Sequence, residues 1–187
     1  MNKIIDLIDA EQRYQNNTIR LIPSENFISE AVKQALSSDL SNKYAEGYPG
    51  KRYYQGNKFI DEIENLAIER GKRLFKVEHM NVQPYSGSPA NAAILMALLE
   101  PRDKICGMKL SAGGHLTHGH PRITFSGKFF ESVQYDVDSE GKIDYAACEE
   151  MVEREKPKRI FCGGTAYPWK IDWQRFSKIA SKVNAYL

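Results

Sequence analysis

Strand-like and helix-like segments alternate along most of this chain, and that order limits its fold more than any other sequence feature. Four short strand-like segments are predicted near residues 80–83, 104–108, 132–135 and 159–162. Apolar spacing and capping residues predict helices near residues 89–99, 144–155 and 172–183. Strands separated by helices of about 10–15 residues are typical of βαβ units. We therefore predict an α/β fold, with a mostly parallel sheet and flanking helices.

The first 57 residues have a different character. They predict a short amphipathic helix at the start and a second helix capped by Ser29, and they end in a tyrosine-rich loop. A longer helix is predicted from about Lys58 to Phe75. We therefore divide the chain into an N-terminal arm, residues 1–57, and a larger domain, residues 58–187. The pattern calls for another strand at residues 185–187, so we expect that domain to be incomplete.

Composition argues against several classes of function. The 26 Lys and Arg residues nearly balance the 24 Asp and Glu residues, so wholesale electrostatic binding of nucleic acid is not indicated. The longest apolar run, residues 92–99, is far shorter than the roughly 18 residues of a membrane span. Three scattered cysteines without a CxxC pair suggest free thiols: Cys106, Cys148 and Cys162. Asp6 and Asp9 interrupt the apolar start, which argues against a signal peptide, and we expect a soluble cytoplasmic protein.

Residues 42–56 read NKYAEGYPGKRYYQG and concentrate four tyrosines, three glycines and one glutamate. Because glycine and proline interrupt helices and strands, we expect the tyrosines on a loop: Tyr44, Tyr48, Tyr53 and Tyr54. Loops with many polar aromatic side chains usually carry function. The alternative is a surface turn that packs on a neighbouring subunit.

A Ser-Gly-Ser turn follows the first strand-like segment and opens the next predicted helix: Ser86, Gly87 and Ser88. Ligands of open α/β sheets bind beyond the carboxyl ends of the strands, where helix N-termini point amide N–H groups at anions. The turn therefore suits a phosphate, and the alternative is an ordinary helix cap. No GxxxxGK[ST] or GxGxxG motif is present, so a nucleoside triphosphate or dinucleotide is not supported.

A glycine-rich loop at residues 111–121 holds three of the four histidines of the chain: His115, His118 and His120. Zinc is one alternative, but neither an HExxH helix nor cysteine partners accompany them. A histidine at the carboxyl edge of a sheet can instead stack on a flat cofactor ring or transfer protons. Two more candidate segments are a helix entry at residues 21–26 and a loop at residues 163–167 that offers a hydroxyl to a cofactor.

Five motifs in this order, LIPSENF, NKYAEGYPGKRYYQG, NVQPYSGSPAN, GGHLTHG and GTAYP, resemble serine hydroxymethyltransferase from about residue 20 to the last residue. The resemblance implies a fold-type I pyridoxal-phosphate enzyme, truncated after about half of an aspartate aminotransferase-like large domain. It implies transfer of the serine hydroxymethyl carbon to tetrahydrofolate, which leaves glycine. It also implies a homodimer or homotetramer whose active sites are shared across an interface.

The same resemblance implies residues that hold the cofactor. Three consecutive residues would bind the phosphate of pyridoxal phosphate: Ser86, Gly87 and Ser88. Tyr44 of a neighbouring subunit would add a hydroxyl to that phosphate. His115 would stack on the pyridine ring, and Thr165, where the family commonly has serine, would meet the phenolic oxygen of the ring.

The residues that the resemblance assigns to the substrates come from three segments. Ser24 would contact the substrate carboxylate, and Glu46 would be the acid–base group near the substrate hydroxyl and folate. Tyr53 and Tyr54 would shape substrate binding from across the interface. Backbone and side-chain atoms after the second strand would line the folate site: Leu110, Gly114, His115 and Leu116.

Two required groups are missing from these motifs. In the family, the acidic partner of the pyridinium nitrogen lies in a VDMAH-like strand that would begin where this chain ends, and the Schiff-base lysine lies further on. We therefore expect residues 1–187 alone to be inactive. Mild departures from the family pattern occur at Gln55, Tyr85 and Pro168. The alternatives are another fold-type I enzyme, such as a threonine aldolase or an aminotransferase, and a non-catalytic remnant that binds a complementary chain.

Overall fold

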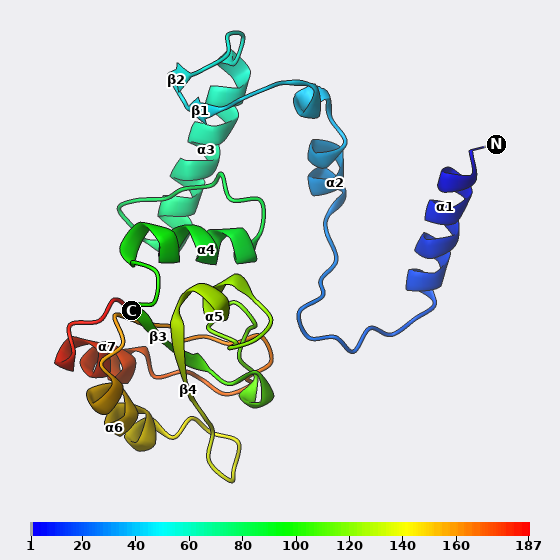
Figure 1. Ribbon diagram of the computed structural model, residues 1–187. Helices are drawn as coiled ribbons and strands as arrows, with labels where there is room; N and C mark the ends of the chain where they lie inside the picture. Colours follow the sequence, from blue (N-terminus) through cyan, green and yellow to red (C-terminus); the bar gives the residue numbers. More distant parts are fainter. Residues whose placement is uncertain (1) are drawn as a thin grey trace. The chain divides into compact units, whose positions relative to one another are not determined.

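The computed structural model describes residues 2–187, which form two compact units. One unit joins the N-terminal residues up to Asn26 to Asn91–Leu187, and the other is Phe27–Ala90. Figure 1 traces the chain from blue at the N-terminus to red at the C-terminus. The predicted boundary between an arm and a larger domain, after residue 57, stays a prediction.

The unit that ends at Leu187 contains a three-stranded parallel sheet in the order β4-β3-β5. Its strands are β3 (Lys104–Met108), β4 (Glu131–Tyr135) and β5 (Arg159–Ile160). Figure 1 labels two of its strands, β3 and β4. Cys106 in the central strand pairs with Val133 on one side and with Ile160 on the other. The parallel pairing confirms the predicted α/β fold, although β5 ends two residues earlier than predicted.

The last residues of the chain add to this sheet. Tyr186 forms a parallel bridge with Arg159. The Ile160 N–H donates to the Tyr186 carbonyl at 2.8 Å, and the Tyr186 N–H donates to the Lys158 carbonyl at 2.9 Å. These bonds confirm that the chain takes up strand pairing where the sequence pattern called for a further strand.

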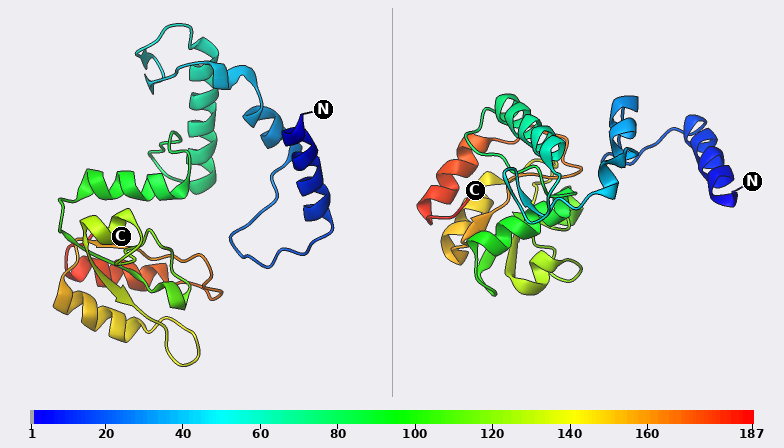
Figure 2. Two further views of the ribbon diagram at one scale, coloured as in Figure 1. Left: turned by 45° about the vertical axis from the view of Figure 1, so that its right-hand side comes forward. Right: turned by 90° about the horizontal axis from the view of Figure 1, so that it is seen from above.

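Two helices cover one face of the sheet, α6 (Tyr145–Glu155) and α7 (Trp173–Lys182), and they lie side by side (Figure 2). Both begin at a capping aspartate. Asp144 accepts the N–H groups of Ala146 and Ala147, and Asp172 accepts the Arg175 N–H. Such caps satisfy amide groups that have no partner inside the helix, and they confirm the predicted helix starts.

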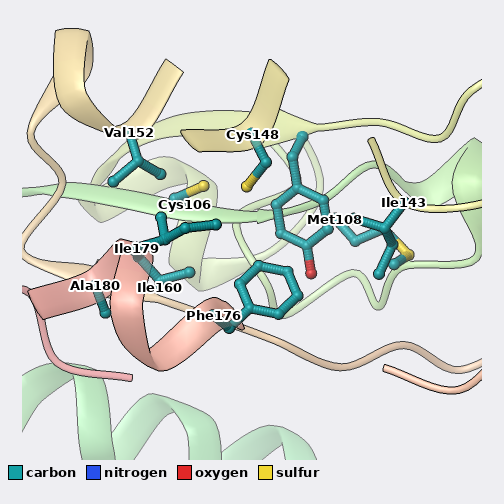
Figure 3. Packing of buried hydrophobic residues seen from close by; sticks show 10 residues of the cluster. Cys106, Met108, Ile143, Cys148, Val152, Ile160, Phe176, Ile179 and Ala180 are labelled. Carbon is teal, nitrogen blue, oxygen red and sulfur yellow. The ribbon is translucent and has the colours of Figure 1, made fainter. Parts of the chain in front are cut away.

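The main core lies between this helix pair and the sheet (Figure 3). Each large aliphatic or aromatic side chain buried here contributes about 1.5–3 kcal/mol relative to an exposed one. The buried members are Cys106, Met108, Tyr135, Ile143, Cys148, Val152, Ile160, Phe176, Ile179 and Ala180. Because they come from all three strands and both helices, this core fixes the strand ends that carry the site.

A second, smaller core is formed by side chains that point away from the main core. It contains Ile105 from β3 and Phe161 after β5, together with Leu95 from α4 (Gly87–Leu98). Phe125, in α5 (Phe125–Phe129), packs against it. The central strand is therefore buried on both faces, as is usual in parallel sheets.

The remaining elements are short apart from two helices, α1 and α3. The Phe27–Ala90 unit contains α2 (Glu30–Leu36), η1 (Asp39–Asn42), β1 (Gly47–Tyr48), β2 (Lys51–Arg52) and α3 (Lys58–Phe75). The other unit adds α1 (Lys3–Asn16) and η2 (Leu110–Ala112). The predicted α1, the Ser29-capped α2 and the predicted α3 are confirmed. Within residues 2–187 no helix is long and apolar enough to cross a membrane.

Three sequence predictions need correction. Residues 80–83 are not a strand; their Gln83 amide donates to the Gly47 carbonyl and to Glu64, each at 2.8 Å, instead of lying in a ladder. The tyrosine-rich loop is not free of strands, because β1 and β2 pair antiparallel as a tight hairpin. The short helix α5 was not predicted, since its sequence FSGKF has no helical apolar repeat.

Candidate functional site

Two of the predicted loops meet beyond the carboxyl ends of β3 and β5. The Gly113 carbonyl accepts the N–H groups of Thr165 at 2.8 Å and of Ala166 at 3.1 Å. Gly113 has φ of 99°, a conformation that favours glycine, and a Cβ there would lie 2.7 Å from the Tyr167 nitrogen. The histidine loop and the Thr165 loop therefore form one connected backbone structure.

His115 is held in this structure through its Nδ1 atom. Nδ1 lies 2.7 Å from the Thr117 hydroxyl oxygen and accepts the Thr117 N–H at 3.1 Å. The Asn91 side-chain amide donates to the same hydroxyl oxygen at 2.7 Å. A helix residue and a loop residue together thus fix the orientation of the His115 ring.

His118 is packed as a neutral, partly buried ring. It stacks on Phe161 with ring centroids 4.7 Å apart, and its centroid is 5.5 Å from that of His115. Burial, followed by the nearby His115, lowers the pKa of His118 to about 4. No group of three or more His, Cys, Asp or Glu side chains within residues 2–187 is placed to hold a metal ion.

The stability of the unit that contains His118 is expected to fall as the pH falls from about 6.5 to about 4. The pKa of His118 is lowered to about 4 from its ordinary value of 6.5, so in this window the unfolded chain binds the proton more readily than the folded chain. Denaturant unfolding of the purified chain across this window measures the effect. His118→Phe keeps a ring against Phe161, and it should flatten the profile relative to wild type; parallel profiles would contradict the assignment.

The Ser-Gly-Ser turn forms the start of α4. The first helical bond joins the Ala90 N–H to the Ser86 carbonyl at 3.2 Å, so the amide groups of Gly87 and Ser88 are left without helical acceptors. All three turn residues are exposed, and the first turn of α4 holds no acidic residue. Within residues 2–187 neither serine hydroxyl of the turn has a hydrogen-bond partner. The turn is therefore a set of free donors at the positive end of a helix.

Arg52 anchors the tyrosine-rich loop. Its side chain is only 5% exposed and forms ion pairs with Asp61 at 2.8 Å and Glu64 at 2.7 Å. Its Nη1 atom donates to the carbonyls of Ala45 at 2.7 Å and Gly47 at 2.9 Å. One guanidinium group thus ties the loop backbone to helix α3.

These bonds fix the backbone on both sides of Glu46. The Glu46 carbonyl itself accepts the Tyr53 N–H at 3.0 Å. The Glu46 side chain is exposed, and so is that of Tyr53, at 83%. The rings of Tyr44 and Tyr54 stack with centroids 5.2 Å apart. The hairpin is therefore a rigid frame that presents Glu46 and the tyrosines outward.

The other predicted site residues differ in how firmly they are held. Ser24 lies on an exposed, irregular segment, and Leu110 is exposed at the start of η2. Gly114 is buried, and a Cβ there would clash with the Met108 carbonyl. The Leu116 carbonyl accepts the Thr124 hydroxyl at 2.7 Å.

The structure brings together only some of the predicted residues. The histidine loop and Thr165 form one group, and Tyr44, Glu46, Tyr53 and Tyr54 form another within Phe27–Ala90. Sequence reasoning missed the three residues that hold these groups: Arg52, Asn91 and Thr117. Each lies inside a quoted motif, so a search of those motifs for side chains with several hydrogen-bonding atoms could have found them.

Comparison with known proteins matches the whole chain to one family. The family model described as serine hydroxymethyltransferase matches residues 1–187. A serine hydroxymethyltransferase of Acidothermus cellulolyticus is 57% identical over 185 residues, which are 98% of this chain and 43% of that protein. A probable serine hydroxymethyltransferase of Mesomycoplasma hyopneumoniae is 56% identical over 99% of this chain and 44% of its own length.

A more distant relative agrees. Serine hydroxymethyltransferase 1 of Pseudomonas fluorescens is 52% identical over 98% of this chain and 45% of its own length. The chain thus spans less than half the length of the curated relatives that it matches. With its parallel sheet, its flanking helices and a family model that matches every residue, the chain belongs to the serine hydroxymethyltransferase family and to the fold-type I architecture.

Proposed function

We propose that this chain is part of an enzyme that reversibly transfers the hydroxymethyl group of serine to tetrahydrofolate, giving glycine and 5,10-methylenetetrahydrofolate. The observation that carries the proposal is the family match along residues 1–187. The relatives named as serine hydroxymethyltransferases support it. Because the chain spans less than half of those relatives, the proposal concerns the whole protein.

The start of α4 fits the phosphate of the proposed cofactor, pyridoxal phosphate. A Cβ built on Gly87 would meet no atom within 4 Å, so the backbone is open to a ligand. Free amides, free hydroxyls and the positive helix end suit a phosphate dianion. We assign phosphate binding to Ser86, Gly87 and Ser88, with a further hydroxyl from Tyr44 of a neighbouring subunit.

The ring of the cofactor would be held by the two connected loops. His115 would lie against its face, and the exposed Thr165 hydroxyl would meet its phenolic oxygen. The Gly113 carbonyl supports this assignment, because it ties the backbone of the Thr165 loop to the loop that carries His115. When bound, pyridoxal phosphate supplies the electron sink for carbanion chemistry at the amino-acid substrate.

The substrates would be handled mainly by the tyrosine-rich loop. The Glu46 carboxyl would hold or accept the proton of the substrate hydroxyl oxygen, and Ser24 would contact the substrate carboxylate. Neutral hydroxyls from Tyr53 and Tyr54 can bind anionic groups without adding charge. The folate would lie along residues of the histidine loop: Leu110, Gly114, His115 and Leu116.

We further propose a cytoplasmic homodimer or homotetramer in which the tyrosine-rich loop serves a neighbouring active site. The exposure of Tyr44 at 70% and Tyr53 at 83% supports this arrangement, because large aromatic side chains gain most when they are covered. Glu46 is also exposed within its own unit, so an interface would have to supply the burial that its proton-transfer role needs.

Exchange of the glycine α-proton by the full-length gene product tests the proposed reaction. We expect exchange to be accelerated by tetrahydrofolate, since the proposed substrate set includes the folate. The matched measurement uses a folate-free reaction under the same conditions. An exchange rate that is the same with and without folate would overturn the proposal and favour another fold-type I enzyme.

The chain of residues 1–187 provides the control for this assay. We propose that it lacks the Schiff-base lysine motif, so borohydride reduction in the presence of pyridoxal phosphate should trap no specific stoichiometric lysine adduct. Recovery of one such adduct, together with serine cleavage by this chain, would contradict that part of the proposal.

A further inference from the structure

Two groups that can only donate, a side-chain amide and a backbone N–H, determine the direction of the hydrogen bonds around His115. The side-chain amide nitrogen of Asn91 can donate hydrogen bonds but cannot accept them, so it must donate to the Thr117 hydroxyl oxygen 2.7 Å away. The Thr117 hydroxyl is then free to donate its own hydrogen along the 2.7 Å contact to His115 Nδ1. These bonds form a chain that runs from the helix residue, through the hydroxyl, to the imidazole ring.

A second donor reaches the same ring atom. The Thr117 backbone N–H, which can only donate, lies 3.1 Å from His115 Nδ1. With two donors directed at it, Nδ1 acts as an acceptor and has no room for a proton of its own. A neutral imidazole carries one proton, so that proton must lie on Nε2.

We propose that Asn91 and Thr117 are positioning residues that hold His115 as the neutral tautomer protonated on Nε2. Neither residue needs to touch a ligand for this role, because both act through the orientation and protonation of the imidazole ring. Only the use of this ring against a cofactor rests on the proposed function.

The tautomer determines what His115 can do at the site. A neutral ring can lie against a flat conjugated group without adding positive charge to it. Its Nε2–H is a single donor, and within residues 2–187 it has no hydrogen-bond partner. His115 therefore holds a proton at Nε2 for an acceptor on a ligand, and its Nδ1 is not available as a general base.

The neighbouring ring places no positive charge beside His115. His118 lies 5.5 Å from His115 and is stacked on Phe161. Its burial disfavours the charged form, and a cation on either ring would repel one on the other. His118 therefore favours the uncharged state.

Two-bond ¹H–¹⁵N correlation spectra of the histidine-labelled chain, recorded without cofactor or substrate, test the tautomer directly. We expect the wild-type His115 signals of the Nε2–H form. Thr117→Val removes the hydroxyl donor and should lower the ratio of the Nε2–H to the Nδ1–H form by about fivefold, the effect of one ordinary hydrogen bond. Thr117→Ser restores the hydroxyl and should restore the wild-type ratio.

Asn91→Asp reverses the direction of the chain of bonds without changing its shape. A carboxylate accepts only, so the Thr117 hydroxyl would donate to it and would accept from His115 Nδ1–H. We expect this variant to shift the proton toward Nδ1 more strongly than Thr117→Val does. An Nδ1–H signal in the wild-type chain, or the same ratio in wild type, Thr117→Val and Asn91→Asp, would overturn the proposal.

Thr18→Val is the matched control, because Thr18 is an exposed threonine whose hydroxyl donates to the Tyr14 carbonyl and lies far along the sequence from His115. It should leave the His115 signals unchanged. The resolved spectra of the other three histidines show whether each variant is folded. These spectra need neither serine nor folate. A wrong tautomer would therefore not contradict the proposed reaction, and absence of the proposed reaction would not contradict the tautomer.

Discussion

Replacing Arg52 with methionine is expected to destabilise the Phe27–Ala90 unit by about 1–3 kcal/mol, the usual cost of leaving partly buried hydrogen-bonding groups without a partner. The guanidinium group is 5% exposed, and the side chains of Asp61 and Glu64 are 24% and 13% exposed. Methionine fills similar space but removes the cation from the Asp61 and Glu64 carboxylates, and it removes one donor each from the carbonyls of Ala45 and Gly47. The effect therefore comes from uncompensated charge more than from lost packing.

The two units allow a clean measurement. Both tryptophans, Trp169 and Trp173, lie in the unit that ends at Leu187, so tryptophan fluorescence monitors that unit. Amide hydrogen exchange in α3 monitors the other unit, because exchange reports local opening free energies. We expect faster exchange in α3 of Arg52→Met with an unchanged tryptophan transition. Unchanged exchange in α3 would show that the ion pairs contribute little.

Two further variants separate charge from geometry. Arg52→Lys keeps the charge but loses the planar fork that reaches four acceptors, so it should recover only part of the loss. Arg154→Met removes a surface cation that pairs with Glu155 at 3.0 Å and is 64% exposed. It should change stability by less than about 0.5 kcal/mol, as exposed pairs usually do.

The regular elements around the sheet could be predicted because their signals are local. Asp144 and Asp172 are capping residues that predict the starts of α6 and α7, and the apolar positions that follow them fit one helical face. β3 is a short apolar run buried on both faces, which is typical of a central parallel strand. These signals need only neighbouring residues, so the α/β class followed from the sequence alone.

The errors arose where distant contacts decide the conformation. Residues 80–83 have a strand-like composition, but Gln83 bonds to Gly47, which is 36 residues away, and no partner strand pairs with them. In α5, a Cβ on Gly127 would clash with the His120 carbonyl, so close packing against another loop accompanies this helix. Local propensity carries no information about either contact.

In the candidate site, too, local features could be predicted and long-range contacts could not. The motifs predicted which loops hold the candidate residues, and the hydrogen bond from the Thr165 N–H to the Gly113 carbonyl joins two of these loops. The residues that support them were not predicted. Arg52 reaches Glu64, 12 positions away, and Asn91 reaches Thr117, 26 positions away. Such pairs depend on how the elements pack, which no local pattern specifies.

If the protein has the proposed function, substituting glutamine for Glu46 in the full-length protein is expected to lower the rate of folate-dependent serine cleavage by about 10²–10⁴-fold, the usual contribution of a positioned acid–base group. Glutamine has nearly the same shape but cannot exchange the proton. The backbone at this position is held by its carbonyl bond to the Tyr53 N–H and by Arg52, which binds the flanking carbonyls. Because none of these bonds uses the Glu46 side chain, the hairpin should keep its structure.

The kinetic design separates a chemical role from a structural one. Loss of proton transfer should lower kcat much more than it changes KM, whereas displacement of the loop should change both. Glu62→Gln is the matched control, because Glu62 is an exposed glutamate on α3 of the same unit. It should retain wild-type kcat. If Glu46→Gln also retained wild-type kcat with serine and folate, Glu46 could not be the acid–base group, and the tyrosine-rich loop would serve binding alone.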